Sequence, residues 1–248
     1  MSRRIPAILF LLHGLLLAAQ PDFYSRLADS ALTLTRQKVI YDPSYYSIGY
    51  PGGDVPAGRG VCSDVVIRAY RKMGIDLQVR VHEDMRAHFG EYPHRWGLTG
   101  PDPNIDHRRV PNLMKFFSRQ GQQEAITDRP EDYLPGEIVC WDLGGGIPHI
   151  GIVSGLRSVD GLRPLIVHNI GGGQELADCL FRYTIIGHYR YNPSMVDTAG
   201  DTDTMNILIG RKPGLCYDMF SIDTLLYNGE GVSPFKIAGS GTLYRIVK

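Results

Sequence analysis

Apolar residues recur every three or four positions in the first half of the chain, which is the period of an amphipathic helix. Three segments follow this pattern: residues 23–36, residues 62–73 and a stretch that ends before Gly121. Gly74 and Gly121 directly follow the second and third segments and predict where those helices end. Asp106 is the predicted N-cap of the third helix. We therefore expect three helices, separated by loops rich in glycine and proline.

The second half of the chain changes to short runs rich in isoleucine, valine and aromatic residues, separated by glycine-rich turns. Runs of this length and composition predict β-strands. Helices thus precede strands along the chain, and this order favours an α+β fold with an antiparallel sheet. The predicted strands are Glu137–Trp141, His149–Ser154, Leu165–Asn169 and Thr184–Tyr191.

The N-terminus has the features of a secretory signal peptide over residues 1–19: basic residues, an apolar run and a small residue at Ala19. The apolar run is shorter than the roughly twenty residues that span a bilayer, so an uncleaved anchor is the less favoured alternative. We expect a mature periplasmic or secreted protein that meets a membrane only during export. Its catalytic domain would cover residues 20–192. Residues 193–248 would form an extension of unknown role, either a strand pair or a poorly ordered tail.

Composition narrows the classes of function. The 248 residues include 26 basic and 26 acidic side chains, so the formal net charge is zero and we expect no nucleic-acid partner. A chain that is 43% hydrophobic and 21% charged is neither disordered nor a multi-pass membrane protein. The four cysteines show no CxxC spacing that indicates zinc. The pairing of Cys140, Cys179 and Cys216 and the oligomeric state stay open, although Cys140 lies in a predicted strand and should be buried.

Cys62 is the first candidate for chemistry. It lies in the first turn of the second predicted helix, on the same face as Val65, Val66 and Ala69. The N-terminus of a helix favours negative charge, so this position should lower the pKa of the thiol. A lone cysteine in such a place is nevertheless more often a small buried hydrophobe.

Two histidines shift this balance towards chemistry. His149 opens one predicted strand and His168 ends the next, so antiparallel pairing brings both imidazoles to one region of the sheet. A histidine near the thiol can take its proton and later protonate a leaving amine. A second polar group must hold that imidazole in the right tautomer. His168 and Asn169 are both candidates, and only one can point at His149 because adjacent strand residues face opposite sides.

This order of residues resembles the NlpC/P60 pattern of papain-like cysteine peptidases from bacterial cell walls. The whole stretch from Tyr41 to Tyr191 is similar to the DUF1287 family, a branch of that superfamily, through phrases such as GVCSDVVIRAYRKMGIDLQ, PHIGIVSG and LIVHNIGGG. The resemblance implies a papain-like fold, with the nucleophile at a helix start packed on a small antiparallel sheet. It also implies Cys62 as nucleophile, His149 as general base and His168 as the orienting residue.

The sequence departs from this pattern next to the cysteine. Val61 and Asp64 stand where typical NlpC/P60 enzymes have aspartate and glycine, which leaves the choice of substrate open. Asp64 is a candidate partner for first-turn N–H groups or for a nearby arginine. The resemblance further suggests a tyrosine before the nucleophile as a substrate or oxyanion contact, for which Tyr46 and Tyr50 are candidates and packing is the alternative. The backbone N–H of Cys62 would supply one oxyanion donor.

Residues 102–109 gather carboxylates, a histidine and two arginines. Their spacing matches neither an EF-hand loop nor HExxH, so we expect no metal and no cofactor. The simpler account is that Asp106 caps the next helix and that the arginines pair with local carboxylates. The alternative is that Arg108 or Arg109 grips a carboxylate of the substrate. Trp141, inside a predicted strand, is expected in the core.

The expected function is that of an exported cysteine hydrolase that cleaves an amide bond in peptidoglycan. Either a stem-peptide endopeptidase or an N-acetylmuramoyl-L-alanine amidase fits the residues. One alternative is a non-catalytic cell-wall-binding module on a papain-like shell, which would not need the intact set of Cys62, His149 and His168. Another is acyl transfer or thioester hydrolysis, but circularly permuted relatives of that kind place histidine before cysteine.

Overall fold

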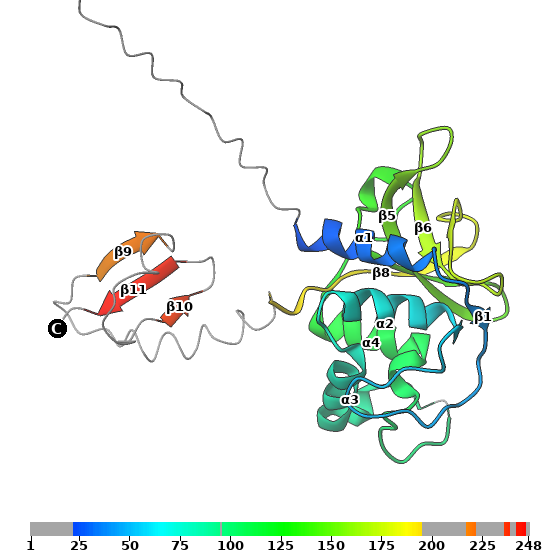
Figure 1. The fold of residues 1–248 in the computed structure, drawn as a ribbon, viewed down its shortest axis with the longest axis horizontal. Helices are drawn as coiled ribbons and strands as arrows, with labels where there is room; N and C mark the ends of the chain where they lie inside the picture. Colours follow the sequence, from blue (N-terminus) through cyan, green and yellow to red (C-terminus); the bar gives the residue numbers. More distant parts are fainter. Residues whose placement is uncertain (1–21, 95, 195–216, 222–235, 239–241, 247–248) are drawn as a thin grey trace, which may run out of the picture.

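The computed structural model describes residues 22–94 and 96–194, together with the backbone of three strands within 217–246 (Figure 1). The predicted signal peptide, residues 1–19, lies outside the described residues. Within these ranges, no helix combines the length and the apolar character that a membrane span requires.

Helices occupy the first half of the described chain, as the apolar spacing predicts (Figure 1). Asp22 is the N-cap of the first helix, and its carboxylate accepts the N–H of Ser25 at 2.9 Å. The helix over residues 77–88 was not predicted. It begins at a second capping aspartate, Asp76, which accepts the N–H of Gln78. The bounds are α1 (Phe23–Leu34), α2 (Cys62–Lys72), α3 (Leu77–His88) and α4 (Val110–Gln120).

The start of α4 corrects one expectation. Arg109, not Asp106, occupies the N-cap position, and Pro111 lies in the first turn. Asp106 instead begins the short 3₁₀ turn η2 (Asp106–Arg108), and its carboxylate accepts bonds from the N–H of Asp102 and the guanidinium of Arg109. Asp106 therefore closes the preceding loop rather than capping the helix.

A six-stranded antiparallel sheet follows the helices, in the order β3-β8-β4-β5-β6-β7. The four predicted strands are confirmed as β4, β5, β6 and β8, and two short edge strands join them. A separate parallel pair joins β1 and β2, far apart in the chain, so that Tyr41 lies beside Gly60. The bounds are β1 (Ile40–Tyr41), β2 (Arg59–Gly60), β3 (Gln122–Gln123), β4 (Ile138–Asp142), β5 (Pro148–Arg157), β6 (Pro164–His168), β7 (Glu175–Ala177) and β8 (Thr184–Arg190).

The C-terminal extension contains a second, smaller sheet. Its strands are β9 (Tyr217–Ser221), β10 (Lys236–Ala238) and β11 (Thr242–Ile246), paired antiparallel in the order β10-β11-β9. Three strands therefore stand in the region for which the sequence left a strand pair or a poorly ordered tail open.

The main sheet is covered differently on its two faces. Ile138, Ile150 and Val167 point towards the helices and share a core with residues of α1, α2 and α4. Their neighbours along the strands alternate to the opposite face, where loop residues cover them. The second cluster consists of Tyr133, Val139, Trp141, Val153, Ile166, Cys179 and Leu180. Trp141 is 1% exposed, which confirms its place in the core.

Candidate active site

Cys62 is the first residue of α2, on the helix-covered side of the sheet. The carboxylate of Asp64 accepts the N–H of Val61 at 2.7 Å, and this bond fixes the turn that enters the helix. The thiol is close to the backbone N–H groups of Ser63 and Ile150, of which the second belongs to β5. The helix start and the beginning of β5 therefore meet at Cys62.

The pKa of Cys62 corrects the expectation drawn from its helix position. Burial raises the pKa of the thiol to about 11, because only 5% of the residue is exposed and a thiolate there loses its hydration. The N–H groups of Ile150 and Ser63 lower the pKa, but by less, and the charge of Asp64 raises it further. The thiol is therefore protonated at neutral pH.

His149 and His168 form a direct pair, as antiparallel pairing of their strands predicts. The Nε2 atom of His149 lies 2.8 Å from the Nδ1 atom of His168, with the rings nearly perpendicular. Burial, together with a smaller effect of the nearby His168, lowers the pKa of His149 to about 3. Burial also lowers the pKa of His168, although the carboxylate of Glu175 partly offsets this effect. Both imidazoles are therefore neutral at pH 7.

The second nitrogen of His168 faces two further groups. Its Nε2 atom lies 3.7 Å from the Sγ atom of Cys179 and 3.7 Å from Oε1 of Glu175, which stands on β7. Cys179 is buried, and burial raises the pKa of its thiol to about 12. Glu175 had no signal in the sequence because β7 has only three residues, and Cys179 stood out there only as a possible disulfide partner.

Asn169, the alternative to His168, has a different role. Its Nδ2 atom donates to the carbonyl of Gly60 at 3.4 Å, and its Oδ1 atom accepts the N–H of Gly171. Asn169 is fully buried, so these bonds tie the end of β6 to the segment that leads into Cys62. His168 is thus the residue that contacts His149.

Cys62 and His149 are neighbours without being bonded to each other. No hydrogen bond joins the thiol to either imidazole within the part of the chain that the structure describes. Strand alternation explains this: Cys62 packs with Ile150 on the helix side, whereas His149 lies beside Trp141 and shares the side of the second cluster. The ring centroids of Trp141 and His149 are 5.9 Å apart.

Asp64 and Arg108, two candidates for binding substrate, are occupied within the protein. The Nε and Nη2 atoms of Arg108 donate to the two carboxylate oxygens of Asp64 at 2.9 and 3.0 Å. Arg108 also donates to the carbonyls of Asp42 and Ser44, and both side chains of the pair are buried. The hydroxyl of Ser63 donates to the carbonyl of Arg108. This network anchors the start of α2, so neither charge is free to bind a substrate.

The two candidate tyrosines also have partners elsewhere. The hydroxyl of Tyr46 donates to Asp42, and Tyr50 packs edge-on against His82. Tyr41 is instead close to the nucleophile segment: it pairs with Gly60, and Cys62 contributes to the rise of its pKa after burial. Sequence reasoning missed Tyr41 because the parallel pairing of β1 with β2 has no signal in two-residue strands.

The loop over residues 102–109 is held by its own side chains. Asp102 accepts bonds from Asn104, and Arg109 pairs with Asp106 at 3.1 Å while its guanidinium lies over the ring of Trp96. His107 is buried, and burial lowers its pKa to about 3. Among the described residues, no cluster of three or more histidine, cysteine or acidic side chains is arranged to hold a metal ion.

The described cysteines are free thiols: Cys62, Cys140 and Cys179 are all buried and unpaired with one another. Cys140 lies in β4 with no exposed surface, which confirms its predicted burial. Cys216 lies outside the described residues, so its pairing stays open.

Comparison with known proteins places most of the described chain in one family. The family model described as "Domain of unknown function (DUF1287)" matches residues 28–191. A relative from Escherichia coli (strain K12), named "Uncharacterized protein YijF", is 52% identical over 165 residues, which cover 66% of this chain and 80% of the relative. No solved structure matches the chain.

Proposed function

The chain belongs to the DUF1287 family, and we propose that it is an exported cysteine hydrolase that cleaves an amide bond in peptidoglycan. In this proposal the domain is a papain-like member of the NlpC/P60 superfamily. Cys62 is the nucleophile, His149 is the general base and His168 orients the base. The observation that carries the proposal is the 2.8 Å bond between His149 and His168, in a strand whose next residue, Ile150, directs its N–H towards the thiol of Cys62 at the start of a helix.

The contacts of His168 favour the tautomer that catalysis needs. The carboxylate of Glu175 lies 3.7 Å from Nε2 of His168 and favours a hydrogen on that nitrogen. The Nδ1 atom of His168 then accepts the hydrogen on Nε2 of His149. This leaves the lone pair of His149 on Nδ1, which is the nitrogen available to the thiol. The chain of contacts thus supports His149 as a base and His168 as its positioning residue.

The proposed cycle uses these groups in sequence. The thiol of Cys62 gives its proton to Nδ1 of His149, and the sulfur attacks the amide carbonyl carbon. The backbone N–H of Cys62 stabilises the oxyanion that forms. The carbon–nitrogen bond then breaks, the amine takes the proton from His149, and a thioester remains on Cys62. Water attacks the thioester with its proton passing to His149, and the returning proton restores the thiol and frees the carboxylic acid product.

The resting site is therefore uncharged. A thiol with a pKa near 11 and an imidazole with a pKa near 3 do not form an ion pair before substrate arrives. Proton transfer requires the two side chains to approach more closely than they do in this structure, and catalytic hydrogen bonds often tighten only in the substrate complex. Because Cys62 is buried, substrate entry must also move the residues that cover it.

A second candidate function has an observation of its own. The buried, protonated thiol without a bond to His149 is also what a non-catalytic wall-binding module would retain. Such a module would bind insoluble peptidoglycan and release no product. Hydrolysis and binding therefore separate the two functions directly.

The test is digestion of purified sacculi by the full chain, with soluble products identified by mass spectrometry. We expect wild type to release peptide fragments and Cys62→Ala to release none above background, a loss of at least about 10⁴-fold. The mass of the products identifies the bond that is cut. Full activity of Cys62→Ala would overturn the proposal.

Cys140→Ala is the matched control, because Cys140 is also a buried free thiol of the same core. It should retain the rate of wild type after correction for the folded fraction. A wild-type protein that binds sacculi but releases no product between pH 5 and pH 8 would favour the binding module.

A further inference from the structure

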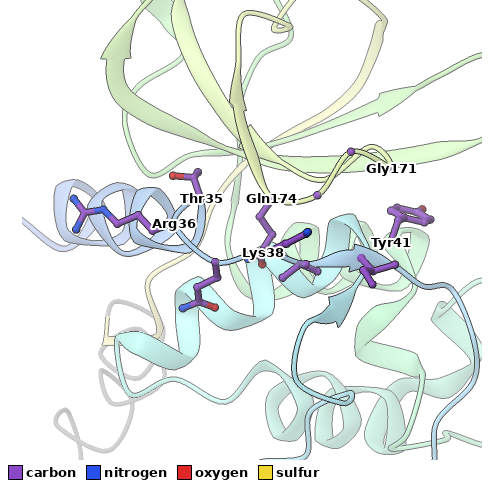
Figure 2. Close-up of a pocket in the computed structure, with 11 residues that line it drawn as sticks. Thr35, Arg36, Lys38, Tyr41, Gly171 and Gln174 are labelled. Carbon is purple, nitrogen blue, oxygen red and sulfur yellow. The ribbon is translucent and has the colours of Figure 1, made fainter.

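A groove of about 530 Å³ lies beside the candidate active site, at the C-terminal end of α1 (Figure 2). One wall is the segment from the end of α1 to β1, and the other is the glycine-rich turn after β6. Tyr41 and Gly171 lie at one end of the groove and Arg36 at the other, with Lys38 and Gln174 between them. The lining residues are Thr35, Arg36, Gln37, Lys38, Val39, Ile40, Tyr41, Gly171, Gly172, Gly173 and Gln174.

Both walls of the groove are attached to the segment that leads into the nucleophile. Tyr41 pairs with Gly60 through β1 and β2. On the other wall, Asn169 donates to the carbonyl of Gly60 and accepts the N–H of Gly171. Gly60 precedes Cys62 by two residues, so the Tyr41 end of the groove opens next to the thiol.

The two walls approach each other so closely that Gly173 is required between them. A Cβ atom on this residue would lie 3.0 Å from the carbonyl oxygen of Val39, and the positive φ of 109° is strained for other residues. The turn is therefore shaped against the β1 segment, and the groove is part of the fold.

The groove carries positive charge and a buried acceptor. Arg36 and Lys38 are exposed, and neither pairs with a carboxylate in the described part of the chain. The side chain of Gln174 is buried: its Nε2 atom donates to the carbonyl of Leu34 at 2.9 Å, which fixes the orientation of the amide. The Oε1 atom of Gln174 has no hydrogen-bond partner among the described residues. Buried acceptors without a partner are rare, and this one requires an N–H or O–H donor.

We infer that this groove binds the part of the substrate peptide that carries a free carboxylate, with Lys38 and Arg36 as its cationic partners. Gln174 accepts an N–H from the same segment. A peptide offers the carboxylate and the N–H together, whereas a phosphate or sulfate ion offers no N–H donor. This inference rests on the proposed function, because it assumes that a peptide substrate of Cys62 extends into the groove. It replaces Arg108 as the partner of a substrate carboxylate, since Arg108 is already bound to Asp64.

The test measures binding without turnover, in the purified full chain with Cys62→Ala. The probes are the stem tripeptide L-Ala-γ-D-Glu-meso-diaminopimelate and the same tripeptide with all carboxylates amidated. Isothermal titration should show that the tripeptide binds at least about tenfold more tightly than its amidated form. Adding Arg36→Gln and Lys38→Gln should remove this preference, while the amidated peptide binds both proteins equally.

Arg80→Gln is the matched control, because Arg80 is an exposed cation on α3 without an ion pair in the described residues. It should leave both affinities unchanged. In ¹⁵N spectra, the tripeptide should shift the side-chain amide resonances of Gln174. Equal binding of the two peptides, equal binding by the double variant, or an unshifted Gln174 would each overturn the inference. The binding assay needs no hydrolysis. A failure of the groove to bind the tripeptide is therefore distinguishable from a failure of wild type to digest sacculi.

Discussion

Two histidine sites lie on the same face of the main sheet, and their pKa values are shifted in opposite directions. His149 and His188 both pair with β4, opposite Trp141 and Val139 respectively, so β4 separates them. His188 directs Nε2 to the carboxylate of Glu137 at 2.7 Å and Nδ1 to the carbonyl of Ala125 at 3.0 Å. Burial lowers the pKa of His188, but these two acceptors raise it more, and the net shift is upward.

The difference arises from what each ring nitrogen faces. Both nitrogens of His188 face acceptors, which favours the protonated ring because only that form donates from both nitrogens. His149 and His168 share one hydrogen between them, so neither ring gains from a second proton. A buried carboxylate thus makes His188 a structural cation, and its absence at His149 leaves a neutral ring whose Nδ1 lone pair is not bonded to a protein donor. Only the neutral site has the properties of a general base.

The largest expected effect is on activity. His149→Gln removes the proposed base, and we expect the rate of product release from sacculi to fall by about 10³-fold. His188→Gln should retain most of the wild-type rate per folded molecule, because the structural cation takes no part in the chemistry. Equal losses in the two variants would show that the two sites do not differ in function.

The next effect is on stability, and here the His188 variant should lose more than the His149 variant. Among the described residues, His188→Gln leaves the buried Glu137 with Arg190 as its only cationic partner, so we expect the unfolding free energy to fall by about 3 kcal/mol. His149→Gln removes no charge at pH 7 and should cost less than about 1.5 kcal/mol. Urea denaturation of both variants beside wild type measures the difference. A larger loss in His149→Gln would contradict the assignment of charge.

The pH dependence of stability should separate the sites further. The folded pKa of His188 is raised, so its contribution is complete below about pH 6.5 and is lost as the pH rises through the folded pKa. The folded pKa of His149 is lowered to about 3, so below about pH 6.5 the unfolded chain binds a proton that the folded protein does not. His149 therefore lowers the unfolding free energy as the pH falls below about 6.5.

Urea titrations from pH 4 to pH 9 therefore test both signs. The stability gap between wild type and His188→Gln should narrow above neutral pH. At pH 5, the unfolding free energy of His149→Gln relative to that of wild type should be about 2 kcal/mol higher than it is at neutral pH. Parallel pH curves for all three proteins would rule out this account of the two pKa shifts.

The smallest expected effect concerns the partner of His168. The carboxylate of Glu175 raises the pKa of His168, and its side chain is half exposed, so the interaction is screened. Glu175→Gln should lower kcat by about twofold to fivefold and move the acid limb of the kcat profile to lower pH, without a change in KM. Glu131→Gln, at an exposed acidic residue, is the control and should leave the profile unmoved.

The sequence predicts most of the elements because their patterns are local. The helices α1 and α2 and the four central strands follow from apolar spacing and turn residues. The helix α3 was missed because two of the five buried positions on its inner face are polar, Gln78 and Asp84, which obscures the apolar period. The edge strands β3 and β7 have two and three residues, too few for a period to be visible.

The sequence predicts the positions of the candidate site residues only where strand pairing alone determines them. Antiparallel strands bring His149 to His168, but alternation does not reveal that Asn169 points to Gly60 instead. The predicted fall in the pKa of Cys62 was wrong because the effect of a helix start is local, whereas burial depends on the whole fold. Tyr41 depends on its pairing with Gly60 in a two-residue strand, and the groove depends on contacts between segments that are more than a hundred residues apart. No local pattern records either kind of contact.

The buried pair of Arg108 and Asp64 has a consequence for genetics. A mutational screen scored by activity would rank Arg108 among the essential residues, because its loss leaves Asp64 uncompensated at the entry to α2 and releases the carbonyls of Asp42 and Ser44. The phenotype would match that of Cys62 variants, although Arg108 has no open surface for a substrate. Inactivity at this position would therefore report on architecture, and a suppressor of it should arise at Asp64 rather than near the bound peptide.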